Sequence, residues 1–219
     1  MPATISALEV QKRNKERVSV FLDGEYAFSL TLIEAARLHK GQTLSDSEIA
    51  ELRARDSIER AVDQAVRFLS FRPRSTSEIR DNLTKKQVPP EAIEAALERL
   101  TQLGYVDDLA FARYWVSNRD EFRPKGPLAL RQELREKGIT SRLCDQVLAE
   151  VDFADAAYRA VQRQVRRWNG LDQTTFRQKV YEFLARRGFR AETIRDVTGR
   201  LQEELEIPPD EEPFDFDDV

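Results

Sequence analysis

An apolar pattern recurs three times in this chain: Leu130 follows Ile79 by fifty-one residues, and Val180 follows Leu130 by a further fifty. A period of this length is typical of helical repeat proteins, in which each copy buries its apolar face with its neighbours. The apolar spacing within the first copy, 61–108, indicates three helices. We therefore expect a mainly α-helical chain with three tandem three-helix repeats in an elongated, curved array. The corresponding positions are Ile79, Leu130 and Val180; Leu83, Leu134 and Leu184; Val88, Ile139 and Phe189; Ile93, Cys144 and Ile194; Ala96, Val147 and Val197; and Leu100, Val151 and Leu201.

The helices of the first copy have recognisable beginnings and ends. Pro73 ends the first helix, and the Ser75 hydroxyl with the Glu78 carboxylate predicts a capping box at the start of the second. Pro90 suits the first position of the third helix, since its φ is already helical and its missing N–H would have no helical partner there. Gly104 ends that helix.

Alternating apolar residues before the repeats predict a small β-rich N-terminal domain with a hairpin whose turn contains Asp23 and Gly24. A two-residue turn would pair Val20 with Ala27, whereas a three-residue loop with Gly24 as a left-handed bulge would pair Val20 with Tyr26. The longer loop gathers the apolar side chains on one face of the hairpin, and we prefer that register.

Two further capping boxes, Thr31 with Glu34 and Ser45 with Glu48, each predict the start of a short helix. The repeats should begin shortly after the second of these. We expect five segments: an N-terminal β-hairpin-containing domain at 1–56, three-helix repeats at 57–108, 109–151 and 152–205, and a disordered acidic tail at 206–219.

The formal net charge of −4 averages two opposite regions. Nine acidic residues and no basic one lie from 203 to 219, so the other 202 residues hold 35 basic against 30 acidic residues, a net +5. A proline-bearing acidic segment of this kind is too polar to bury a core, which is why we expect disorder. The tail either restrains binding by the basic body or only keeps the chain soluble.

The positive charge is concentrated in the third repeat, where 159–190 contains nine basic residues and only Asp172 and Glu182 as acids. A solvated helix surface usually carries both signs, which pair at i,i+4. This imbalance favours contact with a polyanion or an acidic protein groove, since arginine suits both phosphate and carboxylate. Together with the two repeated connectors, the candidate partner- or DNA-binding residues are Arg72, Arg74, Arg123, Lys125, Arg159, Arg163, Arg166, Arg167, Arg177, Lys179, Arg186 and Arg187.

The sequence contains none of the common catalytic motifs. The chain has one cysteine and one histidine, too few for a Cys/His pair or a metal set, and it has no glycine-rich phosphate loop. Asp107 and Asp108 could in principle hold Mg²⁺, but their place before a helix indicates a cap. Cys144 falls on a repeat position, so we interpret it as a core residue and not a reactive thiol. We expect no enzyme, no catalytic residue, no metal and no cofactor.

The chain has no run of eighteen apolar residues and no signal-like start, so we expect a cytoplasmic monomer that does not enter a membrane.

Three stretches of the chain resemble a known family. They are Arg67-Phe-Leu-Ser-Phe-Arg-Pro-Arg-Ser75, Ala92-Ile-Glu-Ala-Ala-Leu-Glu-Arg-Leu100 with Leu103-Gly-Tyr-Val-Asp-Asp108, and Arg131-Gln-Glu-Leu-Arg-Glu-Lys-Gly-Ile139. Together they are similar to RecX, a family of small bacterial regulators of the RecA recombinase. Gln87 departs from the pattern, because the family usually has the glycine seen here at Gly138 and Gly188.

The resemblance implies a non-enzymatic regulator that binds RecA filaments on single-stranded DNA. Such a protein inhibits the recombinase, ATPase and co-protease activities of the filament in DNA repair and the SOS response. A rival interpretation from the helices alone is an independent DNA-binding protein with helix-turn-helix readers. Weak, non-specific DNA binding is compatible with the first interpretation, whereas sequence preference is required by the second.

Overall fold

The computed structural model describes residues 2–168 and 170–207, which fall into two compact units that divide after Val106. The described part is mainly helical, with a small antiparallel sheet at its N-terminal end, so the predicted fold class is confirmed. Of the expected acidic tail, residues 208–219 lie outside the described residues.

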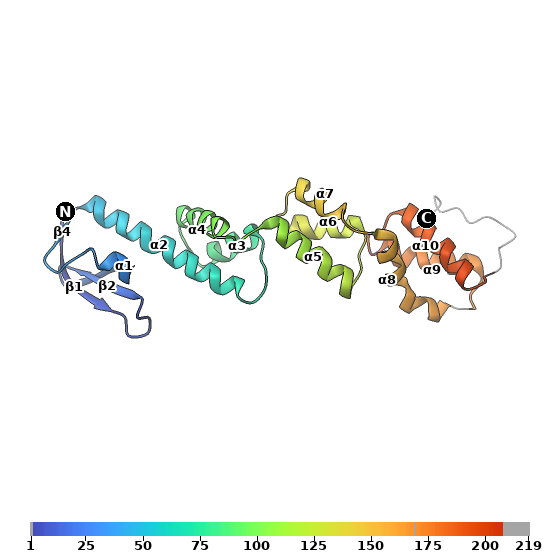
Figure 1. Cartoon of the computed structure of the whole chain (residues 1–219), viewed down its shortest axis with the longest axis horizontal. Helices are drawn as coiled ribbons and strands as arrows, with labels where there is room; N and C mark the ends of the chain where they lie inside the picture. The colour runs from blue at the N-terminus through green and yellow to red at the C-terminus, as the bar shows by residue number, and fades with distance from the viewer. Residues whose placement is uncertain (1, 169, 208–219) are drawn as a thin grey trace. The chain divides into compact units, whose positions relative to one another are not determined.

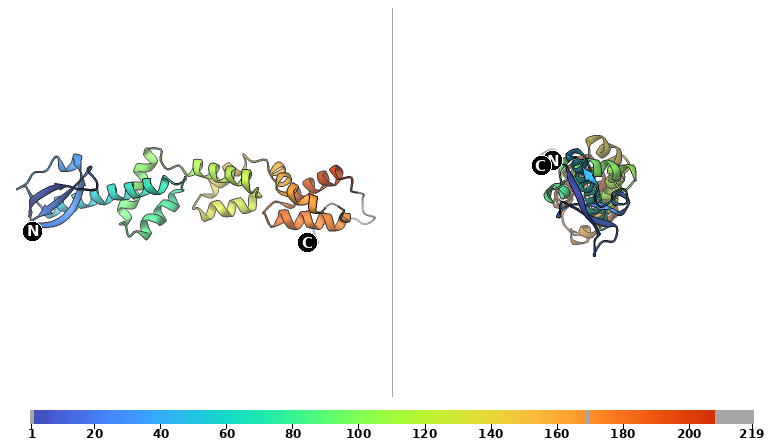
Figure 2. Two further views of the ribbon diagram at one scale, coloured as in Figure 1. Left: turned by 90° about the horizontal axis from the view of Figure 1, so that it is seen from below. Right: turned by 90° about the vertical axis from the view of Figure 1, so that its left-hand side faces the viewer.

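The first unit begins with a four-stranded antiparallel sheet of strand order β3-β2-β1-β4. Its strands are β1 (Ala3–Val10), β2 (Arg17–Leu22), β3 (Glu25–Thr31) and β4 (Thr43–Leu44). One face is apolar because Ile5, Val20 and Leu30 are each fully buried there. This face packs against a short helix, α1 (Leu32–Ala35), and against the first turns of α2 (Asp46–Leu69), as Figures 1 and 2 show.

The preferred hairpin register is wrong: Val20 pairs with Phe28 and not with Tyr26. The turn has two residues, Asp23 and Gly24, both with positive φ, and the register then shifts by one residue between Phe21 and Val20. A β-bulge of this kind turns the following side chains to the opposite face. The hairpin thus keeps one apolar face, as expected, but reaches it by a bulge in the strand and not by a longer loop.

Of the three predicted capping boxes, those at Thr31 with Glu34 and at Ser45 with Glu48 are present. At Ser75 the hydroxyl accepts from the Glu78 N–H as predicted, and the Glu78 carboxylate binds Arg72. The expectation of a short helix after Ser45 is wrong, because α2 has 24 residues and continues into the first three-helix module. Its early residues Ile49 and Leu52 pack against the sheet, so no helix breaker is needed between the β domain and the module.

Three three-helix modules follow one another along the chain, the first in unit 1 and the other two in unit 2 (Figure 1). The first comprises α2, α3 (Thr76–Lys85) and α4 (Pro90–Gln102). The second comprises α5 (Asp108–Phe122), α6 (Pro127–Glu136) and α7 (Ser141–Leu148). The third comprises α8 (Phe153–Trp168), α9 (Gln173–Ala185) and α10 (Ala191–Glu204).

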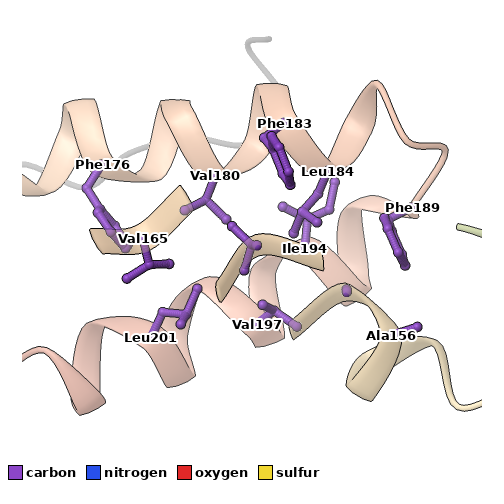
Figure 3. Close-up of a cluster of buried hydrophobic side chains, with 12 residues drawn as sticks. Ala156, Val165, Phe176, Val180, Phe183, Leu184, Phe189, Ile194, Val197 and Leu201 are labelled. Atoms are coloured by element: carbon purple, nitrogen blue, oxygen red, sulfur yellow. The ribbon is translucent and has the colours of Figure 1, made fainter. Parts of the chain in front are cut away.

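Each module has its own apolar core, and the repeated positions form it. All of these positions are buried except Val88 and Val151, which are half-buried and pack at the edge of their cores. Figure 3 shows the third core, where Val180 and Leu184 of α9 point toward Ile194 of α10. Cys144 is fully buried, and burial raises the pKa of its thiol, so its interpretation as a core residue is confirmed.

In each module, the turn before the last helix contains one residue with a left-handed backbone conformation at the same repeat position. Gly138 has φ +76° and Gly188 has φ +78°, and Gln87 adopts φ +60° at the corresponding position of the first module. The missing glycine therefore leaves the turn geometry unchanged, although a side chain in this conformation costs energy.

Candidate partner-binding surface

The twelve predicted site residues divide into two groups. Six are half-buried and hold partners within the chain, and six are exposed. The half-buried residues are Arg72, Arg74, Lys125, Arg159, Arg177 and Arg187. The exposed residues are Arg123, Arg163, Arg166, Arg167, Lys179 and Arg186.

In the first module the Arg-Pro-Arg connector supports the fold. Arg72 donates to both carboxylate oxygens of Glu78, at 2.9 and 3.1 Å. Arg74 stacks its guanidinium 3.9 Å from the centroid of the Phe68 ring. Burial lowers the pKa of Arg74, and the nearby charge of Arg72 lowers it further. Arg72 is therefore already occupied inside unit 1, whereas Arg74 packs on a ring and its buried Nε has no hydrogen-bond partner among the described residues.

Lys125, in the corresponding connector of the second module, pairs with Glu133. Glu133 also accepts from the indole of Trp115 at 2.7 Å and from Arg119 at 2.9 Å. Burial acts to raise the pKa of Glu133, but the hydrogen bonds from Arg119, Lys125 and Trp115 outweigh it and lower the pKa. A carboxylate held charged by three donors fixes Lys125 in place.

Arg159 joins the second module to the third. Its guanidinium donates to Asp155 at 2.6 Å and to Asp120 at 2.7 Å. These carboxylates, Asp155 foremost, raise the pKa of Arg159. The sequence pattern placed this arginine with its neighbours on α8, but its role in the described structure is to link α8 to α5.

A second link between these modules brings candidate residues together. The Gly126 N–H donates to the Arg187 carbonyl at 2.8 Å, and the Leu128 N–H donates to the Gly188 carbonyl at 3.1 Å. A Cβ at Gly126 would lie only 2.1 Å from the Gly188 oxygen, so only glycine allows this approach. The connector that carries Arg123 is thereby held against the turn that carries Arg186 and Arg187.

This contact produces an arginine cluster, which we define as Arg123, Arg186 and Arg187. The Arg187 guanidinium lies 3.9 Å from the centroid of the Phe183 ring. Burial lowers the pKa of Arg187, and the adjacent positive charges of Arg186 and Arg123 lower it further. Within the described residues no carboxylate forms an ion pair with any of the three. Like charges gathered without a counter-charge favour binding of an anionic group from outside.

Other exposed cations lie on α8. Arg163 and Arg166 line a hollow of about 490 Å³ between α8 and α10, together with apolar side chains such as Leu201. Its acid, Glu204, already accepts from Tyr158 at 2.7 Å and from Arg200 at 2.9 Å. These two hydrogen bonds, that of Tyr158 first, lower the pKa of Glu204. The two arginines have no ion-pair partner in the described part of the chain, so the hollow presents positive charge.

Sequence reasoning missed the glycine contact that forms the cluster. A usable signal was present, since Gly126 directly precedes the helix-opening Pro127 where the first module has Ser75. The aspartate pair was interpreted correctly: Asp107 caps α5 by accepting from the Leu109 and Ala110 N–H groups at 2.8 and 3.0 Å.

The fold and this surface define a class, a helical-repeat protein with exposed arginines on its second and third modules. Models of one family match four successive parts of the chain: the regulatory protein RecX N-terminal domain at 3–45, and the first, second and third RecX three-helix domains at 61–100, 107–148 and 150–198. The chain belongs to the RecX family.

Curated relatives carry the same name. A regulatory protein RecX of Bacillus pumilus is 36% identical over 195 residues, which cover 87% of this chain and 74% of the relative. One from Listeria innocua is 32% identical over 209 residues, covering 93% and 77%. A crystal structure of regulatory protein RecX superposes with a TM-score of 0.74 at 30% identity, covering 90% of this chain and 99% of that one. In the described part of this chain, no helix is long and apolar enough to cross a membrane.

Proposed function

We propose that this chain binds filaments of the RecA recombinase on single-stranded DNA in the cytoplasm and inhibits their recombinase, ATPase and co-protease activities. It acts by occupying the filament and performs no chemistry of its own. Membership of a family of regulatory proteins supports this role. RecA is proposed as the partner because the family is understood to regulate RecA.

The observation that carries the proposal is the arginine cluster of Arg123, Arg186 and Arg187. A nucleoprotein filament offers both carboxylates of its protein and phosphates of its DNA, and the arginine fork binds either group with two hydrogen bonds. Because no carboxylate of the described residues pairs with the cluster, no ion pair among them is lost when such a group binds. The exposed arginines of α8 supply further contacts of the same kind.

Successive modules strengthen such binding. Once one module is bound, the next contact on the same chain is intramolecular and benefits from a high effective concentration. Contacts that are individually weak can then hold the chain on a filament that repeats the same surface many times.

Binding measurements test the partner directly. We expect co-sedimentation with RecA filaments on single-stranded DNA at protein concentrations where bare DNA of any sequence retains little of the chain. Binding to bare DNA should weaken steeply with added salt and show no sequence preference. Tight binding to one duplex sequence in gel-shift assays, with no preference for filaments, would instead establish the independent DNA-binding protein.

A further inference from the structure

Further exposed cations lie in unit 1, far along the chain from the arginine cluster. The loop between β1 and β2 carries Lys12, Arg13 and Lys15, and α2 carries Arg60 and Arg67. None of these five side chains forms an ion pair within the described residues. The proposed function uses none of them.

The two α2 arginines share one helix face. Arg60, Gln64 and Arg67 are spaced i, i+4 and i+7, which places them in one row along a helix. This row lines a hollow of about 350 Å³, which is also lined by Tyr26 of β3 and by Gln11, the residue after β1. The hollow is polar and lies entirely within unit 1.

The helix and the sheet that line the hollow are fixed before any ligand arrives. A buried ion pair between Arg17 of β2 and Asp56 of α2 joins the sheet to the helix. Breaking such a pair usually costs about 3–5 kcal/mol, so it holds the two elements together firmly. On the sheet side, the Gln11 amide donates to the Ser29 hydroxyl at 3.0 Å. The hollow is therefore preorganised, which lowers the entropic cost of binding.

Acidic side chains do not cancel the positive charge. Among the residues that line the hollow, Arg60 and Arg67 form no ion pair with the described residues, Arg17 is neutralised by Asp56, and Asp63 is the acid. The two free arginines therefore exceed the one free carboxylate by one positive charge.

An aromatic ring stands at the same hollow. Tyr26 is 56% exposed, although its hydroxyl shares a hydrogen bond of 3.0 Å with Ser29 and its ring packs edge-on against Phe21 at 6.0 Å. A ring held in place and still exposed can stack on a flat partner with little further loss of entropy. Cations beside such a ring are the combination by which proteins bind single-stranded nucleic acids.

We propose that this hollow binds single-stranded nucleic acid, with Arg60 and Arg67 on the phosphates and Tyr26 stacked on a base. A duplex is excluded as the preferred ligand because its bases are already stacked on one another and unavailable to Tyr26. The inference rests on the contacts of unit 1 alone and does not depend on the proposed regulation of a recombinase.

The charge contribution can be tested by fluorescence anisotropy of a labelled thymidine oligonucleotide without any recombinase. The full chain carries Arg123→Glu and Arg186→Glu in every sample, so that the arginine cluster contributes little. In this background, Arg60→Glu with Arg67→Glu should weaken binding by about tenfold or more, and should reduce the salt slope by about 1.4 for two lost phosphate contacts.

The matched control is Arg37→Glu with Lys40→Glu, which makes the same charge change at exposed residues of unit 1 outside the hollow. It should bind within about twofold of the background chain. Equal losses in the two variants, or no binding by the background chain, would overturn the proposal. If circular dichroism shows that the glutamate variant is unfolded, Arg60→Gln with Arg67→Gln provides the same comparison.

The stacking contribution has a separate signature. Tyr26→Ala should weaken binding by about 5- to 150-fold, the range typical of one stacked base, and leave the salt slope unchanged. Tyr26→Trp should retain binding. An abasic oligonucleotide of the same length should bind the unsubstituted hollow as weakly as the thymidine oligonucleotide binds the Tyr26→Ala variant. Equal binding of abasic and thymidine strands, or tighter binding of a duplex, would contradict the assignment.

Discussion

At position 87 a glutamine adopts a left-handed backbone conformation for which the other two modules use Gly138 and Gly188. For an L-residue this conformation costs about 1–2 kcal/mol, because Cβ crowds the backbone. Glycine avoids that cost but loses more conformational entropy on folding, by about 0.5–1 kcal/mol. The first module thus tolerates a strained residue in a turn that its burial of Leu83 and Ile93 already determines.

The first prediction concerns this strain. Gln87→Gly should stabilise unit 1 by about 0.5–1 kcal/mol, the difference between the two costs. Chemical denaturation of the full chain measures the change. Unchanged or lower stability would show that the Gln87 side chain makes a compensating contact.

At the scale of single elements, most of the fold was predictable because helix starts and buried helix faces depend on residues that are close in sequence. The capping boxes at Thr31 and Ser45, Pro90 at a helix start and the burial of most repeat positions follow from neighbouring residues and were correct. The hairpin register was wrong because a bulge at Ala27 depends on which face the sheet buries. The length of α2 was wrong because Ile49 and Leu52 pack on strands that are distant in sequence.

The candidate surface was only partly predictable, because its composition is a local property of the sequence and its side-chain contacts are not. An excess of arginine is visible in the sequence, but which arginines are occupied depends on distant partners. Arg159 forms an ion pair with Asp120, and Lys125 forms one with Glu133. Neither pair follows from the spacing of residues along a helix. The contact that gathers the arginine cluster likewise depends on two glycines sixty-two residues apart, Gly126 and Gly188.

The second prediction tests that contact between elements. Gly188→Ala should destabilise unit 2 by about 1–3 kcal/mol more than Gly104→Ala destabilises unit 1. Both substitutions strain a residue with positive φ, but only a Cβ at Gly188 meets the backbone of Ala129, at 2.5 Å. Gly104 is the matched control because nothing lies within 4 Å of its added Cβ. Equal destabilisation by the two changes would show that the modules separate at little cost.

At the scale of the whole molecule, charge is distributed unevenly. Residues 208–219, outside the described part, contain six acidic residues and no basic one. The hollow that presents Arg163 and Arg166 includes Leu205, three residues before this segment begins. A tethered acidic segment acts at high local concentration and competes with other anions for nearby arginines.

The third prediction follows from this competition. Deleting 208–219 should raise affinity for the filament, most strongly at low salt, and the difference should fade as salt screens both partners. Co-sedimentation at two salt concentrations measures it. If affinity and its salt dependence are unchanged, the tail serves only solubility.

The central claim is that the arginine cluster holds the chain on the recombinase filament. Replacing Arg123 and Arg186 by Glu reverses two exposed positive charges while leaving the half-buried Arg187 on Phe183. Each charge-assisted contact is worth about 1.5–3 kcal/mol, so losing two should weaken binding by about two orders of magnitude or more. The Arg37→Glu and Lys40→Glu chain provides the same change in net charge elsewhere.

The most direct measurement is RecA ATPase activity on single-stranded DNA, titrated with the wild-type chain and both variants. The wild-type and control chains should inhibit at similar concentrations, and the Arg123→Glu, Arg186→Glu chain should require about a hundredfold more, with circular dichroism confirming its helices. Equal inhibition by all three chains would remove the cluster from the interface, and no inhibition by the wild-type chain would contradict the proposed function itself.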